Sequence, residues 1–182
     1  MRQEPIQVTR ACIATAIPSG EKIELRPGEK VVVSQALGGT FTVMTADGYL
    51  VRIAAPDADA IGQTPPVAKH GAEAHGDLSL EERIQAELKT VYDPEIPVDI
   101  VELGLVYGTE VSSLPEGGQQ VHVQMTMTAP GCGMGDILRE EVLDKLRALP
   151  GVKDVKVEIV LDPPWEPSRM SEAARLATGI FW

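Results

Sequence analysis

The residues best suited to chemistry lie in one short segment, residues 125–135, which reads Met-Thr-Met-Thr-Ala-Pro-Gly-Cys-Gly-Met-Gly. Its alternating start predicts the end of a β-strand, the Pro-Gly pair predicts a turn, and the following residues predict a helix. Cys132 lies at this junction and is one of 2 cysteines in the chain. The unpaired N–H groups at a helix N-terminus favour an anion, so we expect the Cys132 thiol to ionise more readily than an ordinary cysteine.

The small residues around Cys132 are candidates for lining a ligand. Gly131 and Gly133 allow the backbone to approach a ligand closely, although a compact turn would require them equally. Thr126 and Thr128 share a predicted strand face with His122 and lead toward Cys132, and Thr128 is the candidate next to the turn. The segment lacks a Gly-Lys-Ser/Thr ending, which argues against a phosphate-binding loop.

A carboxylate-rich loop precedes this segment. Carboxylate oxygens are ligands for hard metal ions, and Glu102 is the candidate ligand because it directly precedes an apolar strand. The alternative is that these carboxylates cap turns in a path fixed by prolines, which is the role expected for Asp93. The acidic residues of this loop are Asp93, Glu95, Asp99 and Glu102.

The first third of the chain has the pattern of a small β unit. Residues 1–55 alternate short apolar runs with Pro and Gly turns, which predicts a β-barrel-like unit. Asp47-Gly48 predicts a hairpin turn, and the run 8–17 predicts a strand that buries Cys12. Residues 56–78 are rich in Ala, Gly, Pro and Asp and predict a flexible linker.

Residues 79–182 have the pattern of an α+β domain. Ser79 and Glu82 form a capping-box signature that opens a helix. Two strands, a second helix after Cys132 and a third strand follow, so the predicted order is αββαβ. This order predicts a two-layer sandwich of helices on a small sheet, with a C-terminal helix and an aromatic tail that ends at Trp182.

Charge and composition exclude several classes of function. The net charge is −11, and residues 79–182 carry nine basic and eighteen acidic side chains, so nucleic-acid binding is not expected. Neither a leader nor a membrane span is expected, which predicts a cytoplasmic protein. Two cysteines are too few for a four-cysteine zinc or cluster site within one chain. No histidine is placed by sequence as a base for Cys132, so an enzyme is not expected.

Three motifs together resemble the metal–sulfur cluster biosynthesis domain family, which includes PaaD-like and MIP-type proteins. The first is residues 93–106, Asp-Pro-Glu-Ile-Pro-Val-Asp-Ile-Val-Glu-Leu-Gly-Leu-Val, the second is residues 126–135, and the third is Asp-Pro-Pro-Trp at residues 162–165. The added N-terminal β unit makes the whole chain similar to the SufT subgroup. Cys132 stands at the position of the family's signature cysteine.

The resemblance implies an auxiliary factor in iron–sulfur protein maturation. In one interpretation Cys132 transiently binds an iron–sulfur cluster or iron and passes it to client apoproteins. One thiol per chain then favours a homodimer, because a cluster takes four ligands. In the other interpretation the chain binds no cluster and is an adaptor that docks clients to a cluster donor and other assembly proteins.

Overall fold

The computed structural model describes residues 4–64, 77–129 and 133–179. The chain divides into a first unit up to Ala68 and a second from Lys69 onward. Both contain strands and the second is rich in helices, so the predicted mixed α+β class is confirmed. Gly131 and Cys132, together with the end of the aromatic tail, lie outside the described residues.

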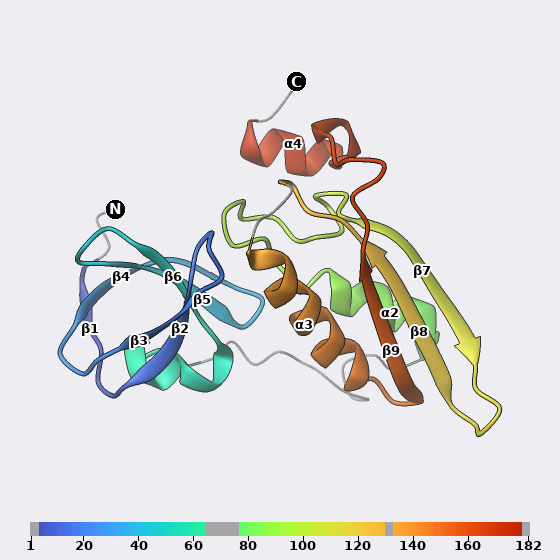
Figure 1. Cartoon of the computed structure of the whole chain (residues 1–182), viewed down its shortest axis with the longest axis horizontal. Coiled ribbons are helices and arrows are strands. Elements are labelled where there is room, and N and C mark those ends of the chain that lie inside the picture. Colours follow the sequence, from blue (N-terminus) through green and yellow to red (C-terminus); the bar gives the residue numbers. More distant parts are fainter. Residues whose placement is uncertain (1–3, 65–76, 130–132, 180–182) are drawn as a thin grey trace. The chain divides into compact units, whose positions relative to one another are not determined.

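The first unit is built on one six-stranded antiparallel sheet with the order β1-β4-β5-β6-β2-β3 (Figure 1). The Asp47-Gly48 turn joins β5 to β6, with Gly48 at φ +83°, as the hairpin signal predicted. The strands are β1 (Ile6–Gln7), β2 (Cys12–Ala16), β3 (Lys22–Leu25), β4 (Lys30–Leu37), β5 (Thr40–Thr45) and β6 (Leu50–Ile53).

Two details of this unit differ from the sequence-based expectation. The linker is predicted to begin at residue 56, but Ala55–Ile61 forms the 3₁₀-helix η1, whose Ala58, Ala60 and Ile61 are completely buried. The predicted strand 8–17 is interrupted because the Thr9 N–H donates to the Ala60 carbonyl at 2.7 Å instead of to a neighbouring strand. The first part of the expected linker is therefore part of the core of the first unit.

Cys12 lies in this core, as predicted. It is 5% exposed and packs among the buried apolar side chains of the sheet. Burial raises the pKa of its thiol, with the negative charge of Asp57 adding to the effect. Cys12 is therefore a structural residue with little thiolate character.

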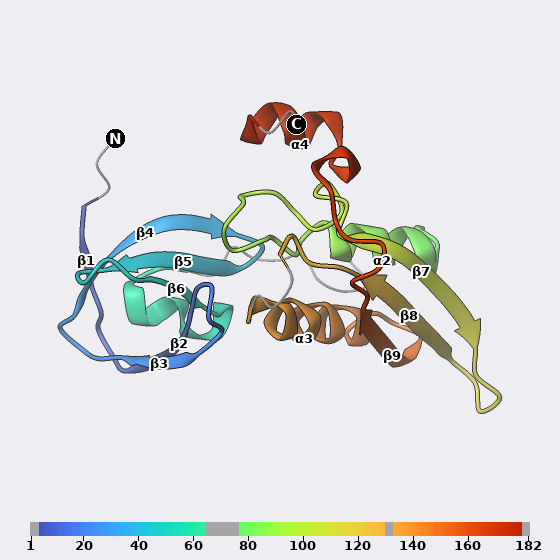
Figure 2. The ribbon, with the colours of Figure 1, turned by 45° about the horizontal axis from the view of Figure 1, so that its top comes forward.

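The second unit has the predicted order αββαβ, followed by a C-terminal segment (Figures 1 and 2). Its sheet has the order β7-β8-β9, with β7 antiparallel and β9 parallel to β8. The elements are α2 (Leu80–Leu88), β7 (Val106–Ser113), β8 (Gln119–Met125), α3 (Met134–Arg147), β9 (Val152–Ile159), η2 (Pro167–Arg169) and α4 (Glu172–Thr178).

Local sequence signals explain these elements. Ser79 and Glu82 form the predicted capping box at the start of α2, because each side chain accepts from the other residue's backbone N–H. Alternate residues of β8 face the core of the second unit, and the apolar side of α3 packs in the same core. Within the described ranges, no helix is long and apolar enough to cross a membrane.

Candidate functional site

The three sequence motifs meet at one end of the three-stranded sheet. β8 and β9 run in parallel, so both end there, and the antiparallel β7 begins there. The carboxylate loop leads into β7, the cysteine segment follows β8, and the Asp-Pro-Pro-Trp motif follows β9 (Figures 1 and 2). Ligands of open α/β sheets bind beyond the carboxyl ends of the strands, and we call this region the motif end of the sheet.

Two aspartates hold the carboxylate loop in shape. Asp93 is 4% exposed, and its Oδ1 accepts from the N–H groups of Glu95 and Ile96, each at 2.9 Å. Asp99 Oδ1 accepts in the same way from Val101 and Glu102, each at 3.0 Å. These are local turns in which a carboxylate replaces a backbone acceptor, so the role predicted for Asp93 is confirmed.

Asp99→Asn is expected to stabilise the protein at neutral pH. Burial raises the pKa of the Asp99 carboxyl above its ordinary 3.8, against the opposing effect of the two N–H donors. The folded state therefore holds this proton more tightly than the unfolded state, so its contribution to stability falls as the pH rises through that raised pKa. Asparagine keeps the Oδ1 acceptor and removes the charge.

The measurement is thermal unfolding of wild type and Asp99→Asn at pH 7 and at a pH well below 3.8. The variant should melt at a higher temperature at pH 7, and the difference should shrink in acid, where Asp99 is protonated in both states. A variant that melts lower at pH 7 would contradict the argument.

Glu102, the candidate oxygen ligand, already has two partners. Its Oε1 lies 3.3 Å from Lys89 Nζ, and the Ser171 side chain also hydrogen-bonds to it. The Ser171 hydrogen bond and Lys89 lower the pKa of the Glu102 carboxyl, so it is ionised at neutral pH. A metal at Glu102 would have to compete with these contacts.

Hydrogen bonds hold the segment after β9 against the residues that lead into β7. Trp165 Nε1 donates to the Leu103 carbonyl at 2.8 Å, and the Ser171 N–H donates to the Glu102 carbonyl at 2.9 Å. The Arg169 guanidinium lies 4.3 Å from the ring centroid of Tyr107. No sequence signal pairs Tyr107 with Arg169, because the two residues are distant along the chain.

The described residues on both sides of the cysteine turn differ in burial and in backbone role. Thr126 is buried and its N–H donates to the Leu105 carbonyl at 2.8 Å, whereas Thr128 is only half-buried. Gly133 is the N-cap of α3, at φ −61°, and offers no side-chain cap. Gly133 therefore needs no positive φ, and the first N–H groups of α3 have no side-chain acceptor at the N-cap.

The other titratable side chains in the described part of the chain do not form a metal-binding site. Nowhere in residues 4–64, 77–129 and 133–179 do three or more His, Cys, Asp or Glu side chains group so that they could hold a metal ion. His122 faces the solvent side of the sheet, where its Nε2 lies 3.2 Å from Glu158 Oε2. Cys132, the predicted sulfur ligand, lies outside the described residues.

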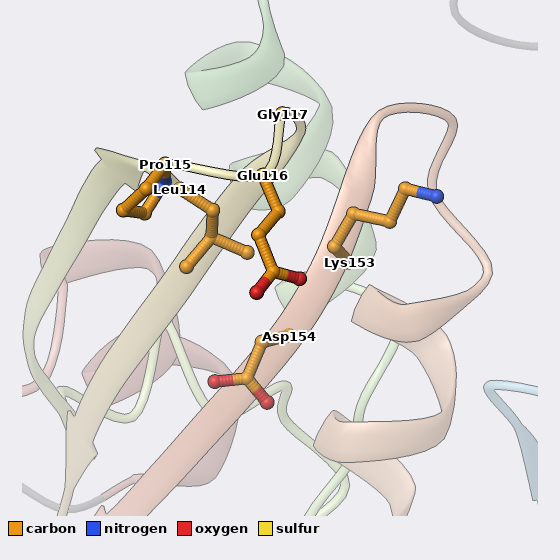
Figure 3. Close-up of a pocket in the computed structure, with 6 residues that line it drawn as sticks. All are labelled: Leu114, Pro115, Glu116, Gly117, Lys153 and Asp154. Carbon is orange, nitrogen blue, oxygen red and sulfur yellow. The ribbon is translucent and has the colours of Figure 1, made fainter.

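A hollow of about 410 Å³ lies at the opposite end of the same sheet (Figure 3). It is lined by the turn between β7 and β8, with Glu116 reaching toward β9, and by Lys153 and Asp154. The length of β8 places it about 20 Å from the motif end. This hollow is not part of the candidate site.

Comparison with known proteins identifies the family. The model of the iron-sulfur cluster assembly protein family matches residues 81–159, which include the carboxylate loop, the cysteine turn and all three strands of the second unit. A Porphyromonas gingivalis protein named Fe-S protein maturation auxiliary factor is 44% identical over 104 residues, or 57% of this chain and 95% of that protein. The chain belongs to the iron–sulfur cluster assembly protein family.

Two further members of this family are similarly close. The Bacillus subtilis Fe-S protein maturation auxiliary factor YitW is 45% identical over 102 residues, covering 56% of this chain and 96% of the relative. The Staphylococcus aureus Fe-S protein maturation auxiliary factor SufT is 42% identical over 90 residues, covering 50% of this chain and 98% of the relative. Between 95% and 98% of each relative is thus matched by 50–57% of this chain.

Proposed function

We propose that this protein is an auxiliary factor of iron–sulfur protein maturation that carries a cluster, or iron, as cargo on Cys132 and passes it to client apoproteins. The observation that carries the proposal is the meeting of three family motifs at one end of the sheet, beside the uncapped N-terminus of α3. A thiolate next to that N-terminus is favoured by the helix N–H groups. The names of the relatives support a general role in maturation.

The number of thiols suits a transient carrier. A cluster takes four ligands, and the other cysteine of this chain is buried in the core of the first unit. In this proposal the remaining ligands come from a second copy in a homodimer, from small thiols, or from the client's own cysteines. Incomplete ligation by the carrier leaves the cargo free to move by ligand exchange to a client that offers more thiolates.

The other proposed site residues have secondary roles. Gly131, Gly133 and Thr128 line the cargo, since small residues let the backbone approach it. Glu102 is the proposed oxygen ligand, and a metal ion bound there would have to replace the ion pair between its carboxylate and Lys89. The proposal places the protein in the cytoplasm, where thiols stay reduced.

The test is anaerobic reconstitution of the purified full chain with iron and sulfide, wild type beside Cys132→Ser. Wild type is expected to gain visible absorption of a bound cluster and to elute as a dimer, and the variant is expected to lose essentially all of that absorption. The buried Cys12 serves as the matched control, because Cys12→Ala should retain the cluster. Equal cluster binding by wild type and Cys132→Ser would refute the carrier function.

A cluster-free adaptor is the second candidate. The observation that favours it is exposed apolar surface on the C-terminal segment, where Leu161 is 54% and Leu176 is 65% exposed. Such side chains fit a protein partner. Client maturation in cells separates the two functions, because an adaptor would support it with Cys132→Ser and would fail with Leu176→Glu.

A further inference from the structure

We propose that the outer edge of β7 binds the β7 strand of a second copy of this chain, in antiparallel orientation, so that two three-stranded sheets join into one. Figures 1 and 2 show β7 as the outermost strand of the second unit's sheet. Among the described residues β8 is the strand that pairs with it, and no backbone hydrogen bond joins residues 106–113 to a turn or loop. The outer edge therefore presents N–H and C=O groups that another strand can bind.

The sheet edges of the described chain differ in how they are protected against such pairing. In the first unit the edge strands are short, with two residues in β1 and four in β3. In the second unit β9 has eight residues, but four of them are charged: Lys153, Asp154, Lys156 and Glu158. Short strands and charged side chains, lysine above all, are the usual protection of an edge. The eight residues of β7 include one charged side chain, Glu110, and no lysine or proline, so this edge is left open to pairing.

The sequence of β7 favours one register of the pair. Residues 108–113 pair regularly with β8, because the bulge lies before them, between Val106 and Gly108. When two identical strands pair in antiparallel orientation, the two-fold axis is perpendicular to the sheet and passes between two copies of one residue. In the middle of 108–113 this residue is Glu110 or Val111. Glu110 on the axis would place two carboxylates directly opposite each other, which is unfavourable, so we infer that Val111 lies on the axis.

The register with Val111 on the axis gives compatible neighbours across the pair. Glu110 of each copy lies opposite Ser112 of the other, and both side chains are exposed. Thr109, whose Oγ1 is buried without a hydrogen-bond partner among the described residues, lies opposite Ser113. Pairs of β-branched residues and pairs of hydroxyl residues directly across two strands are favourable. Both interactions occur twice or lie on the axis, as expected of an interface between identical chains.

The test is sedimentation equilibrium of the full chain without metal. A strand-pair interface is small, so the Kd for dimerisation is expected to be on the order of 100 μM, and concentrations up to about 1 mM are needed. Ser112→Glu should raise this Kd roughly fivefold, because it places a carboxylate opposite Glu110 at two positions in the dimer. Ser112→Lys should lower the Kd by a similar factor, because opposite charges then lie across the pair.

Two further sets of variants separate strand pairing from overall charge. The double variant Glu110→Lys/Ser112→Glu places opposite charges across the pair again, so its Kd should be no higher than that of wild type. Gln124→Glu and Gln124→Lys make the same changes in net charge as the Ser112 variants, at an exposed position on β8 away from the outer edge of β7. They should leave the Kd within about twofold of wild type.

The inference would be overturned by wild type that stays monomeric at about 1 mM. It would also be overturned if Ser112→Glu and Ser112→Lys shifted the Kd in the same direction, or by no more than the Gln124 variants do. These outcomes are independent of the cargo test, because association is measured without metal. If wild type binds no cluster but the Kd values follow the expected order, the strand pair stands and the carrier function falls; a cluster bound through Cys132 by chains that show no such order gives the reverse.

Discussion

Gly104→Ala is expected to lower the free energy of unfolding of the second unit by roughly 3 kcal/mol or more. Gly104 has φ +70°, a conformation that disfavours a side chain by about 1 kcal/mol. A Cβ at this position would also lie 2.7 Å from the carbonyl carbon of Arg169 and closer still to its oxygen. The obstacle is backbone, which Trp165 and Ser171 hold in place on either side, so it cannot readily move aside.

Two other glycines separate these contributions in urea denaturation followed by circular dichroism. Gly151 has φ +90°, but nothing lies within 4 Å of the point that a Cβ would occupy, so Gly151→Ala should destabilise by only about 1 kcal/mol. Gly135 is helical, with Met127 at an ordinary 3.5 Å, so Gly135→Ala should leave stability unchanged or raise it by up to about 1 kcal/mol. If Gly104→Ala were as mild as Gly151→Ala, the C-terminal segment would not be packed against Gly104 as described.

The close approach at Gly104 gives a physical reason for the Glu-Leu-Gly-Leu part of the first motif. The glycine lets the segment after β9 lie on the start of β7, where Trp165 binds the Leu103 carbonyl and Ser171 binds the Glu102 carbonyl. The first and third motifs are therefore two halves of one packed structure. The second motif joins it through the bond from Thr126 to the Leu105 carbonyl.

The parts of the fold that could be predicted from sequence are those with a local cause. The Ser79 capping box and the Asp47-Gly48 hairpin each depend on a few adjacent residues, and both occur as predicted. The 3₁₀-helix η1 was missed because Ala, Asp and Pro resemble a linker, and its stability comes from burial of Ile61 and from the distant Thr9. Neither the burial of Ile61 nor the hydrogen bond from Thr9 can be predicted from the residues next to η1 in the sequence.

The same distinction holds for the candidate site. The motifs indicate where a site is expected, and the turn role of Asp93 followed from its Pro-rich surroundings. The unpartnered hydroxyl of Thr126 among the described residues and the pairing of Tyr107 with Arg169 could not be predicted, because both depend on which chain segments cover them. An alternating strand end predicts that a threonine is present on a face but not whether its hydroxyl finds a partner.

Asp93→Ala is expected to lower the free energy of unfolding by about 2–3 kcal/mol, whereas Asp93→Asn should change it by less than about 1 kcal/mol. Alanine removes the Oδ1 acceptor of the Glu95 and Ile96 N–H groups in a loop where Asp93 is 4% exposed. Asparagine keeps an oxygen at the same position. Urea denaturation of the two variants beside wild type gives the difference directly.

Cluster binding by the same variants distinguishes a structural carboxylate from a ligand. At a temperature where Asp93→Ala is fully folded, reconstitution should give as much cluster per folded chain as wild type, because Asp93 Oδ1 is occupied by backbone donors. Full stability combined with lost cluster binding would make Asp93 a ligand instead. The expected result would make Asp93 a structural residue of the carboxylate loop, whose side chain accepts the two backbone N–H groups instead of binding cargo.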